Sequence, residues 1–213
     1  MYPYIKRIID FSMALIGLII LSPIFILLAI IIKLDSKGPV FFKQKRLSMD
    51  KRYFNILKFR TMRTDTPKDM PTHMLNNPDA FITRLGRFLR KTSLDELPQI
   101  INILKGEMSI VGPRPCLWNQ YDLIAERDKY GANNIHPGLT GWAQVNGRDE
   151  LPIDVKAKLD GEYVKRMNFT FDVKIFFMTI FRVIKSDGVK EGGIGSIEIK
   201  TIQEVDVREK VVK

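Results

Sequence analysis

Two adjacent carboxylates, Asp95 and Glu96, are the side chains of this sequence whose types and spacing best suit chemistry. Arg90 and Lys91 precede them by a few residues. Carboxylates among cations can hold Mg²⁺ together with phosphate oxygens, and a carboxylate can attack phosphorus to form an acyl-phosphate. The alternative is structural, because Ser93 and Glu96 have the spacing of a capping box, and acids stabilise a helix N-terminus. The pattern alone leaves both interpretations open.

Three further cations accompany the acidic pair along the chain. Arg114 lies between two prolines in the segment 112–115 (GPRP), which restrict the backbone on both sides and present an arginine suited to phosphate. Lys58 and Arg60 are two residues apart on a predicted strand and would share one face, either binding phosphate or lipid headgroups or facing solvent. Because nearby cations favour the charged form of a carboxyl group, we expect Asp95 to be ionised at neutral pH.

The segment 136–148 (HPGLTGWAQVNGR) contains three glycines, which permit close approach of a ligand to the backbone. Trp142 could stack on a base or a sugar, although a tryptophan packed in the core is the more usual case. His136, which precedes a proline, is expected to be structural. We predict a loop for this segment, with the cation Arg148 at its end.

The composition limits the classes of protein to which this chain can belong. Its 213 residues suit one domain, and 45% hydrophobic with 27% charged residues excludes wholesale disorder. A single cysteine, Cys116, excludes an intrachain disulfide framework, and two histidines make a zinc site improbable. The formal charge of +10 favours anionic partners. Nucleic acid is the alternative partner, but acids interspersed among the bases disfavour it.

One apolar segment near the start indicates a membrane protein. The 22 residues from Phe11 to Ile32 carry no charge, and as a straight helix they would span about 33 Å, enough to cross a bilayer. Ser22 and Pro23 lie in the middle of the run, where the proline should kink the helix. Basic residues flank both ends, and residues 33–70 contain eleven basic and four acidic residues. A re-entrant helix places both basic flanks in the cytoplasm, whereas a straight crossing places only one there.

The remaining pattern predicts an α+β fold that is mostly helical. Aromatic and β-branched residues predict a β-hairpin from strands 40–46 and 53–61. Apolar residues at helical spacing predict an amphipathic, basic helix over 81–91 that could lie on a membrane surface or pack on the core. Further helices are predicted at 97–104, 152–166 and 173–184. The expected organisation is a membrane helix at 1–34, a catalytic domain at 35–190 and a C-terminal tail at 191–213.

Five segments in a fixed order carry a resemblance to a known family. They read KRIIDFSMALIGLIILSP, GPVFFKQKR, LKFRTM, SLDELPQIINILKGEMSIVGPRP and GLTGWAQVNGR. The chain, from about residue 4 to residue 190, resembles the bacterial sugar transferases, the monotopic phosphoglycosyl transferases that start glycan assembly. Its length resembles that of small members such as the bacillosamine-phosphate transferase type. The family usually has glycines where Ser48 and Lys51 stand here, so the type of the hairpin turn is open.

The resemblance implies a two-step reaction. A UDP-sugar gives its sugar-1-phosphate to an aspartate with release of UMP, and undecaprenyl phosphate then takes the sugar phosphate. By position, Asp95 is the nucleophile and Glu96 its partner, and the two would hold Mg²⁺. The residues implied to bind the phosphates and the nucleotide sugar are Lys58, Arg114, Arg148, Gln144 and Asn146.

The resemblance also implies a location. Ser22 and Pro23 match the family's re-entrant break, which implies a monotopic protein on the cytoplasmic face of the bacterial inner membrane, among its lipids. No nucleic acid is expected as a partner. The identity of the sugar stays open between acetamido sugars, hexoses and bacillosamine derivatives, and the oligomeric state is not implied.

Overall fold

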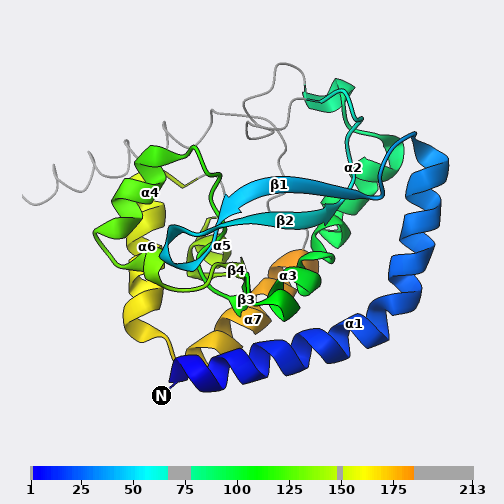
Figure 1. The fold of residues 1–213 in the computed structure, drawn as a ribbon. Coiled ribbons are helices and arrows are strands. Elements are labelled where there is room, and N and C mark those ends of the chain that lie inside the picture. Colours follow the sequence, from blue (N-terminus) through cyan, green and yellow to red (C-terminus); the bar gives the residue numbers. More distant parts are fainter. Residues whose placement is uncertain (1, 67–77, 148–150, 185–213) are drawn as a thin grey trace, which may run out of the picture.

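The computed structural model describes residues 2–66, 78–147 and 151–184, which form a mostly helical α+β structure (Figure 1). The fold class predicted from the sequence is therefore confirmed at this level. The helices are α1 (Tyr2–Asp35), α2 (Arg84–Lys91), α3 (Gln99–Lys105), α4 (Tyr121–Asp128), α5 (Trp142–Asn146), α6 (Ile153–Arg166) and α7 (Phe169–Ile184). The strands are β1 (Phe41–Leu47), β2 (Tyr53–Phe59), β3 (Ser109–Val111) and β4 (Gly138–Thr140).

Helix α1 contains the apolar segment and continues through Ser22 and Pro23. The Ser22 hydroxyl donates a 2.8 Å hydrogen bond to the carbonyl of Ile19, the group to which Pro23 cannot donate because it lacks an N–H. Figure 1 shows that α1 changes direction along its length and borders two sides of the structure. A proline inside a helix is one of the known causes of such a change of direction.

Both ends of α1 are bound to the rest of the chain. Near the start, the guanidinium of Arg7 donates to the carbonyl of Ile103 at 2.6 Å. Near the end, the guanidinium of Arg60 donates to the carbonyl of Ser36 at 2.6 Å. Arg60 is buried, and it donates to the carbonyl of Ile32 in the last turn of α1 and to those of the two residues 36 and 37 that follow the helix. Its side chain is therefore neither solvated nor available to phosphate in this structure, contrary to both expectations from the sequence.

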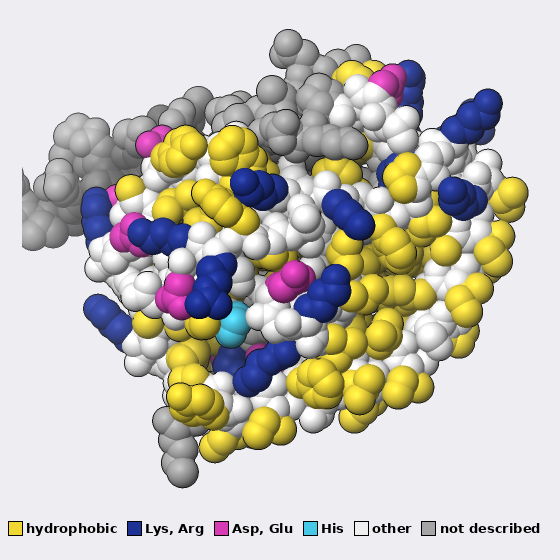
Figure 2. All heavy atoms as spheres, in the orientation of Figure 1, with side chains coloured by type: hydrophobic (Ala, Val, Ile, Leu, Met, Phe, Trp, Pro, Cys, Tyr) yellow, Lys and Arg dark blue, Asp and Glu magenta, His cyan; other side chains and the backbone are white. Residues whose placement is uncertain are grey.

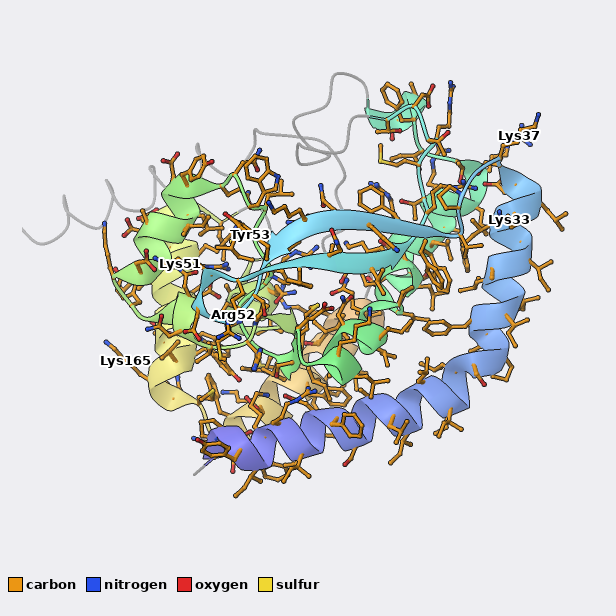
Figure 3. The ribbon with its side chains drawn as sticks, in the orientation of Figure 1. Lys33, Lys37, Lys51, Arg52, Tyr53 and Lys165 are labelled. Carbon is orange, nitrogen blue, oxygen red and sulfur yellow. The ribbon has the colours of Figure 1, made fainter. Side chains whose placement is uncertain are left out.

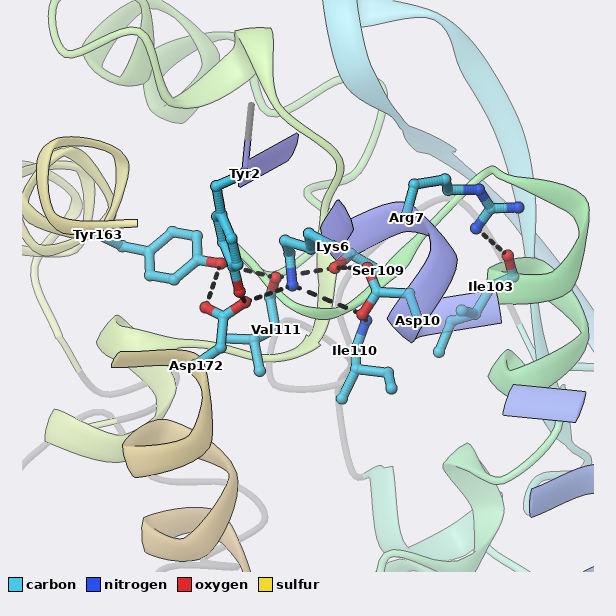
Figure 4. A network of polar contacts seen from close by, with 10 residues as sticks. All are labelled: Tyr2, Lys6, Arg7, Asp10, Ile103, Ser109, Ile110, Val111, Tyr163 and Asp172. Atoms are coloured by element: carbon cyan, nitrogen blue, oxygen red, sulfur yellow. Dashed lines mark hydrogen bonds and ion pairs between the residues drawn. The ribbon is translucent and has the colours of Figure 1, made fainter. Parts of the chain in front are cut away.

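A buried polar network fixes the first turns of α1 (Figure 4). The Lys6 ammonium lies 2.7 Å from Asp172 Oδ2 and 3.5 Å from Asp10 Oδ1. Asp172 also accepts hydrogen bonds from the hydroxyls of Tyr2 and Tyr163, at 2.6 and 2.8 Å. Buried charges are tolerated when they are paired and hydrogen-bonded. The network therefore joins α1 firmly to α6 and α7, although its members are up to 170 residues apart.

One face of α1 packs on the core and the opposite face is open. Ala14 packs in a cluster with Ile100 and Ile103 of α3, and Leu28 packs in a second cluster with Phe59. The open face carries large apolar side chains that are exposed: Ile5, Ile8, Phe11, Met13, Leu15, Ile16, Ile19, Ile20, Ile24, Ile26, Leu27, Ile30, Ile31 and Leu34. Figure 2 shows this apolar surface along the lower and right borders of the molecule. By length and composition, α1 could cross a membrane.

Strands β1 and β2 form the predicted antiparallel hairpin, with Phe41 opposite Phe59 and Leu47 opposite Tyr53. Lys51, which stands where the family usually has a glycine, has a left-handed φ of 58°. That conformation explains why glycine would suit the position. Ser48 has an ordinary extended backbone with φ of −102°, and it needs no glycine.

The segment 136–148 is not the loop that the sequence predicted. Gly138–Thr140 forms β4, which pairs in parallel with β3 in the register Ser109 to Gly138, and residues 142–146 form α5. These elements are too short for a visible periodicity, and parallel pairing joins segments that are distant in sequence. Arg148 and the predicted tail 191–213 lie outside the described residues.

The other predicted helices are confirmed as α2, α3, α6 and α7. In α2, Leu89 is fully buried, as the core-packing alternative predicted, whereas Phe88 is exposed and does not pack on the core. In α7, Ile175 is fully buried whereas Phe177 and Phe181 are exposed. Helix α7 therefore has one covered face and one open apolar face.

Candidate active site

The acidic pair lies in a short 3-10 turn, Leu94–Glu96, between α2 and α3. Ser93, the residue before this turn, has a left-handed φ of 58° and makes no side-chain cap hydrogen bond. The capping-box interpretation of Ser93 and Glu96 is therefore wrong. A serine in the left-handed region is unusual and bends the chain sharply, which separates the acidic turn from the end of α2.

Two cations from distant segments converge on Glu96. The Lys58 ammonium on β2 donates to Glu96 Oε1 at 2.7 Å, and the Arg114 guanidinium donates to the same oxygen at 3.0 Å. Lys58 also lies 3.9 Å from Asp95 Oδ2. The structure thus brings together four residues that the resemblance implied for the site. Asp95 is the most enclosed of them, with 8% of its surface exposed.

Arg90 is a site residue to which the sequence assigned no role beyond its charge. It projects from α2, its Nε donates to the hydroxyl of Thr61 at 2.8 Å, and its charge acts on Asp95. The signal available in the sequence was its position five residues before Asp95. That spacing shows neither which way the side chain points nor that Thr61 holds it.

Burial and the neighbouring charges separate the two carboxyl groups in acidity. Burial, together with the negative charge of Glu96, raises the pKa of Asp95 from 3.8 to about 6 against the opposing effects of Lys58, Arg90 and Arg114. Burial also opposes the charge of Glu96, but the cations Arg114 and Lys58 outweigh it and hold the pKa of Glu96 well below its usual value. The sequence predicted the effect of the cations on Asp95 but not the larger effect of burial.

The acidic pair fits a Mg²⁺ ion by the chemistry of its donors. Among the described residues, no group of three or more His, Cys, Asp or Glu side chains could enclose a metal ion. Mg²⁺ usually keeps several waters and is held by one or two carboxylates together with substrate phosphates. Two adjacent carboxylates beside the cations Lys58 and Arg114 are compatible with that pattern. Both cations contact Glu96 through the one oxygen Oε1.

Gln144 and Asn146, which the resemblance implied for the nucleotide sugar, have local partners. Gln144 donates to the carbonyl of Leu139 at 3.1 Å, and Asn146 donates to the carbonyl of Trp142 at 2.7 Å. Gln144 is half-buried and Asn146 is exposed. These hydrogen bonds hold the chain between β4 and the end of α5, so contacts of either residue with a substrate stay a prediction.

Trp142 packs against neighbouring helices, and His136 is partly buried. The Trp142 indole donates to Glu162 at 3.0 Å, and its ring lies 5.1 Å from the ring of Phe171. Burial lowers the pKa of His136, which favours the neutral imidazole. Trp142 therefore packs between helices, as the structural alternative predicted. Neither Trp142 nor a neutral His136 has a charge that could act on the acidic pair.

Comparison with known proteins places the chain in a family. It matches the family described as bacterial sugar transferase over residues 1–186. It is 41% identical over 191 residues to the undecaprenyl-phosphate glucose phosphotransferase of Komagataeibacter xylinus, a match that covers 85% of this chain and 36% of that protein. It is 39% identical over 188 residues to the uncharacterized sugar transferase EpsL of Bacillus subtilis (strain 168), covering 88% of this chain and 91% of EpsL.

A third relative has a similar degree of identity. The UDP-glucose:undecaprenyl-phosphate glucose-1-phosphate transferase of Escherichia coli (strain K12) is 39% identical over 191 residues, covering 84% of this chain and 40% of that protein. The chain thus spans nearly all of EpsL and well under half of the other two relatives. Because the family match covers most of the sequence, the chain belongs to the bacterial sugar transferase family.

Proposed function

We propose that this protein transfers a sugar-1-phosphate from a UDP-sugar to undecaprenyl phosphate, with release of UMP, at the start of glycan assembly. Relatives named for transfer to undecaprenyl phosphate support the acceptor, and relatives named for UDP-glucose support the donor class. The observation that carries the proposal is the convergence of Lys58 and Arg114 on the Asp95–Glu96 pair. A carboxylate held beside two phosphate-binding cations suits attack on a diphosphate.

In the first step, a carboxylate oxygen of Asp95 attacks the β-phosphorus of the donor. The new bond joins Asp95 to that phosphorus, and the bond from the phosphorus to the bridging oxygen breaks. UMP leaves with the bonding electron pair, and the sugar phosphate stays on Asp95 as an acyl-phosphate. Arg114 and Lys58 stabilise the negative charge that develops on the phosphate oxygens as the bond breaks.

In the second step, a phosphate oxygen of the acceptor attacks the same phosphorus. The bond to Asp95 breaks, the carboxylate is regenerated, and the product is an undecaprenyl diphosphate sugar. Glu96 stays ionised throughout because its pKa is low, so it can hold the two cations in place during both steps. A bound Mg²⁺, held by Asp95 and Glu96, would neutralise charge on the diphosphate.

The proposed location is the cytoplasmic face of the inner membrane, with α1 entering the bilayer and returning to the same side. The exposed apolar face of α1 supports insertion, since no described part of the chain covers it. The contacts of Arg7 and Arg60 support the return, because they join both ends of α1 to the structure that holds the acidic pair. Figure 3 shows Lys33 and Lys37 at the C-terminal end of α1, where they follow the apolar stretch, and the proposal places them on the aqueous side.

Pro23→Ala is expected to straighten α1 and to shift its N-terminus toward the periplasm. A straight helix cannot keep both ends bound to the same body, so the contacts of its first turns would be lost. The measurement is labelling of an introduced Tyr4→Cys thiol with a membrane-impermeant reagent, since Tyr4 is 81% exposed and the native Cys116 is buried. Ile24→Ala, at the neighbouring exposed position, is the matched control. Unchanged labelling after Pro23→Ala would show that the proline does not set the topology.

Activity is expected to fall as the pH drops through about 6, because that is the raised pKa of Asp95 and only its ionised form can attack phosphorus. The measurement is kcat/KM for the UDP-sugar across a pH series that runs from below this pKa to well above it, which reports on the free enzyme. Samples held at each pH and then assayed at one neutral pH control for unfolding. The series is repeated at decreasing Mg²⁺ concentrations, because a bound cation lowers the pKa of a carboxyl group. An acidic limb that stays near the ordinary aspartate value of 3.8 at the lowest Mg²⁺ concentration that supports turnover would contradict the effect of burial on Asp95.

A panel of UDP-sugars with undecaprenyl phosphate tests the function itself, with UMP release as the readout. At least one UDP-sugar should give acceptor-dependent turnover, and a short reaction without acceptor should leave a sugar-phosphate adduct on residue 95 in the intact mass spectrum. A protein that is folded and embedded in membrane but releases no UMP with any of these donors would contradict the proposal. A folded protein that binds partner proteins but gives no turnover would then favour the alternative of a membrane-anchored adaptor without enzymatic activity.

A further inference from the structure

The turn that presents Arg114 is held through three successive backbone carbonyls. The carbonyl of Pro113 accepts a hydrogen bond from the amide of Gly138 at 2.9 Å. The carbonyl of Arg114 accepts one from Arg127 Nη1 at 3.0 Å, and that of Pro115 accepts one from Arg46 Nη1 at 3.0 Å. The two prolines have no N–H to donate, so these carbonyl contacts carry much of the restraint on the turn.

Arg127 is the central one of these three donors. It projects from α4, and only 3% of its surface is exposed. Its Nε and Nη2 atoms lie 2.8 and 2.7 Å from one oxygen of Asp160 on α6, and its third nitrogen, Nη1, reaches the carbonyl of Arg114. The flat guanidinium therefore connects α6 to the turn in one fixed plane.

The connection continues to the acidic pair. The backbone carbonyl of Arg114 accepts the hydrogen bond from Arg127, and the Arg114 side chain donates to Glu96 at 3.0 Å. Asp160 is 1% exposed, so its charge and that of Arg127 are enclosed together. Enclosed ion pairs are often no more stabilising than apolar residues of the same volume. A gain in stability is therefore a weak explanation for the presence of the Arg127–Asp160 ion pair. The direction in which Arg127 Nη1 points, by contrast, is fixed by the planar guanidinium and could not be reproduced by an apolar residue.

We infer that Arg127, held by Asp160, is a positioning residue: by fixing the backbone at Arg114, it keeps the Arg114 side chain beside the acidic pair. The inference rests on the proposed function, in which Arg114 binds the phosphates of the donor. Arg127 contacts the backbone of the turn and acts on the donor only through Arg114. Catalytic geometry is sensitive to small displacements, so the loss of this hold should reduce kcat/KM while the fold persists.

A double-mutant cycle between Arg127→Lys and Arg114→Ala tests this route of action. Lysine keeps the charge beside Asp160 but cannot also fix the carbonyl of Arg114, because an ammonium on a flexible stem has no planar fork. We expect Arg127→Lys to lower kcat/KM for the UDP-sugar by at least about tenfold in the wild-type background. The same substitution should have little further effect in the Arg114→Ala background, where residual UMP release is followed over long incubations.

Controls separate positioning from loss of structure. Lys51→Gln removes the exposed ion pair between Lys51 and Asp128, the residue next to Arg127 on α4, and should leave turnover unchanged. Thermal unfolding of each variant shows whether it is folded. Should Arg127→Lys fail to fold, Asp160→Asn keeps the size of the side chain, weakens its hold on Arg127, and enters the same cycle.

Each outcome has one meaning. Non-additive effects in folded variants support the inference. Additive effects, or an unchanged kcat/KM in folded Arg127→Lys, overturn it while leaving the proposed function intact. Failure of both Arg127→Lys and Asp160→Asn to fold also overturns it, because the pair would then serve stability. Absence of UMP release from the folded wild-type protein would instead count against the proposed function.

Discussion

Asp95→Asn is expected to abolish turnover while leaving the protein folded and bound to the membrane. An amide has nearly the shape of a carboxylate but is not a nucleophile toward phosphorus, so neither UMP release nor the adduct should appear. The measurement is UMP release with undecaprenyl phosphate in detergent or nanodiscs, together with the intact mass after exposure to donor. Turnover above about 10% of wild type would count against Asp95 as the nucleophile.

The same substitution is expected to raise the free energy of unfolding at a pH above the raised pKa of Asp95. That pKa is about 6 in the folded protein, chiefly because of burial, against 3.8 as the ordinary value. Stability therefore decreases as the pH rises from about 4 to about 6, where the unfolded chain is ionised and the folded protein still binds the proton. Above that range the wild-type protein carries the full cost of the buried charge, and the Asp95→Asn variant does not.

Thermal unfolding of the two proteins, at a pH well above the raised pKa and at a pH well below it, measures this difference. The variant should unfold at a higher temperature than wild type at the higher pH, and the gap should shrink at the lower pH. An equal or lower unfolding temperature for the variant at the higher pH would contradict the role of burial. The combined result, activity lost and stability gained, would distinguish a functional carboxylate from one that stabilises the fold.

Removal of Mg²⁺ by EDTA is expected to abolish turnover as completely as Asp95→Asn does, and added Mg²⁺ should restore it. Asp95 and Glu96 are adjacent, and the charge of Glu96 disfavours ionisation of Asp95. A divalent cation would relieve this repulsion and neutralise the donor diphosphate. The assay is UMP release after dialysis against EDTA, followed by titration with Mg²⁺.

EDTA already saturated with Mg²⁺ is the matched control and should not inhibit. Glu96→Gln should raise the Mg²⁺ concentration that gives half of maximal activity, because it removes one of the two charged donors. Undiminished turnover in excess chelator would remove the metal ion from the mechanism. It would leave Lys58 and Arg114 as the groups that neutralise the donor phosphates.

Much of the fold could be predicted from the sequence because its signals are local. The uncharged run from Phe11 to Ile32 predicts a membrane helix, and aromatic and β-branched residues predict the hairpin. The short strands β3 and β4 and the helix α5 could not be predicted, because the strands pair with each other across a long stretch of sequence and α5 is only five residues long. The same limit applies to Phe88, whose exposure depends on which side of α2 meets the core.

For the candidate site, too, the sequence predicted the residue types but not their contacts. Arg60 and Lys58 look equivalent in sequence, yet Lys58 contacts Glu96 and Arg60 is bound to the end of α1. The pair Ser93 and Glu96 matches a capping box, yet Glu96 is taken by cations from β2 and from the turn after β3. In each case the sequence gives the type of the side chain, but its partner is determined by which segments lie next to it in the folded protein.

Charge, hydropathy and spacing are properties of the chain, so they were enough to predict a long apolar helix, a basic remainder and an adjacent acid pair among cations. Three further features became visible only in the folded protein: Lys58 and Arg114 meet at Glu96, both ends of α1 bind the same body, and Asp95 is enclosed enough to raise its pKa. Burial and convergence arise when segments distant in sequence pack together, and local sequence patterns carry no information on that packing.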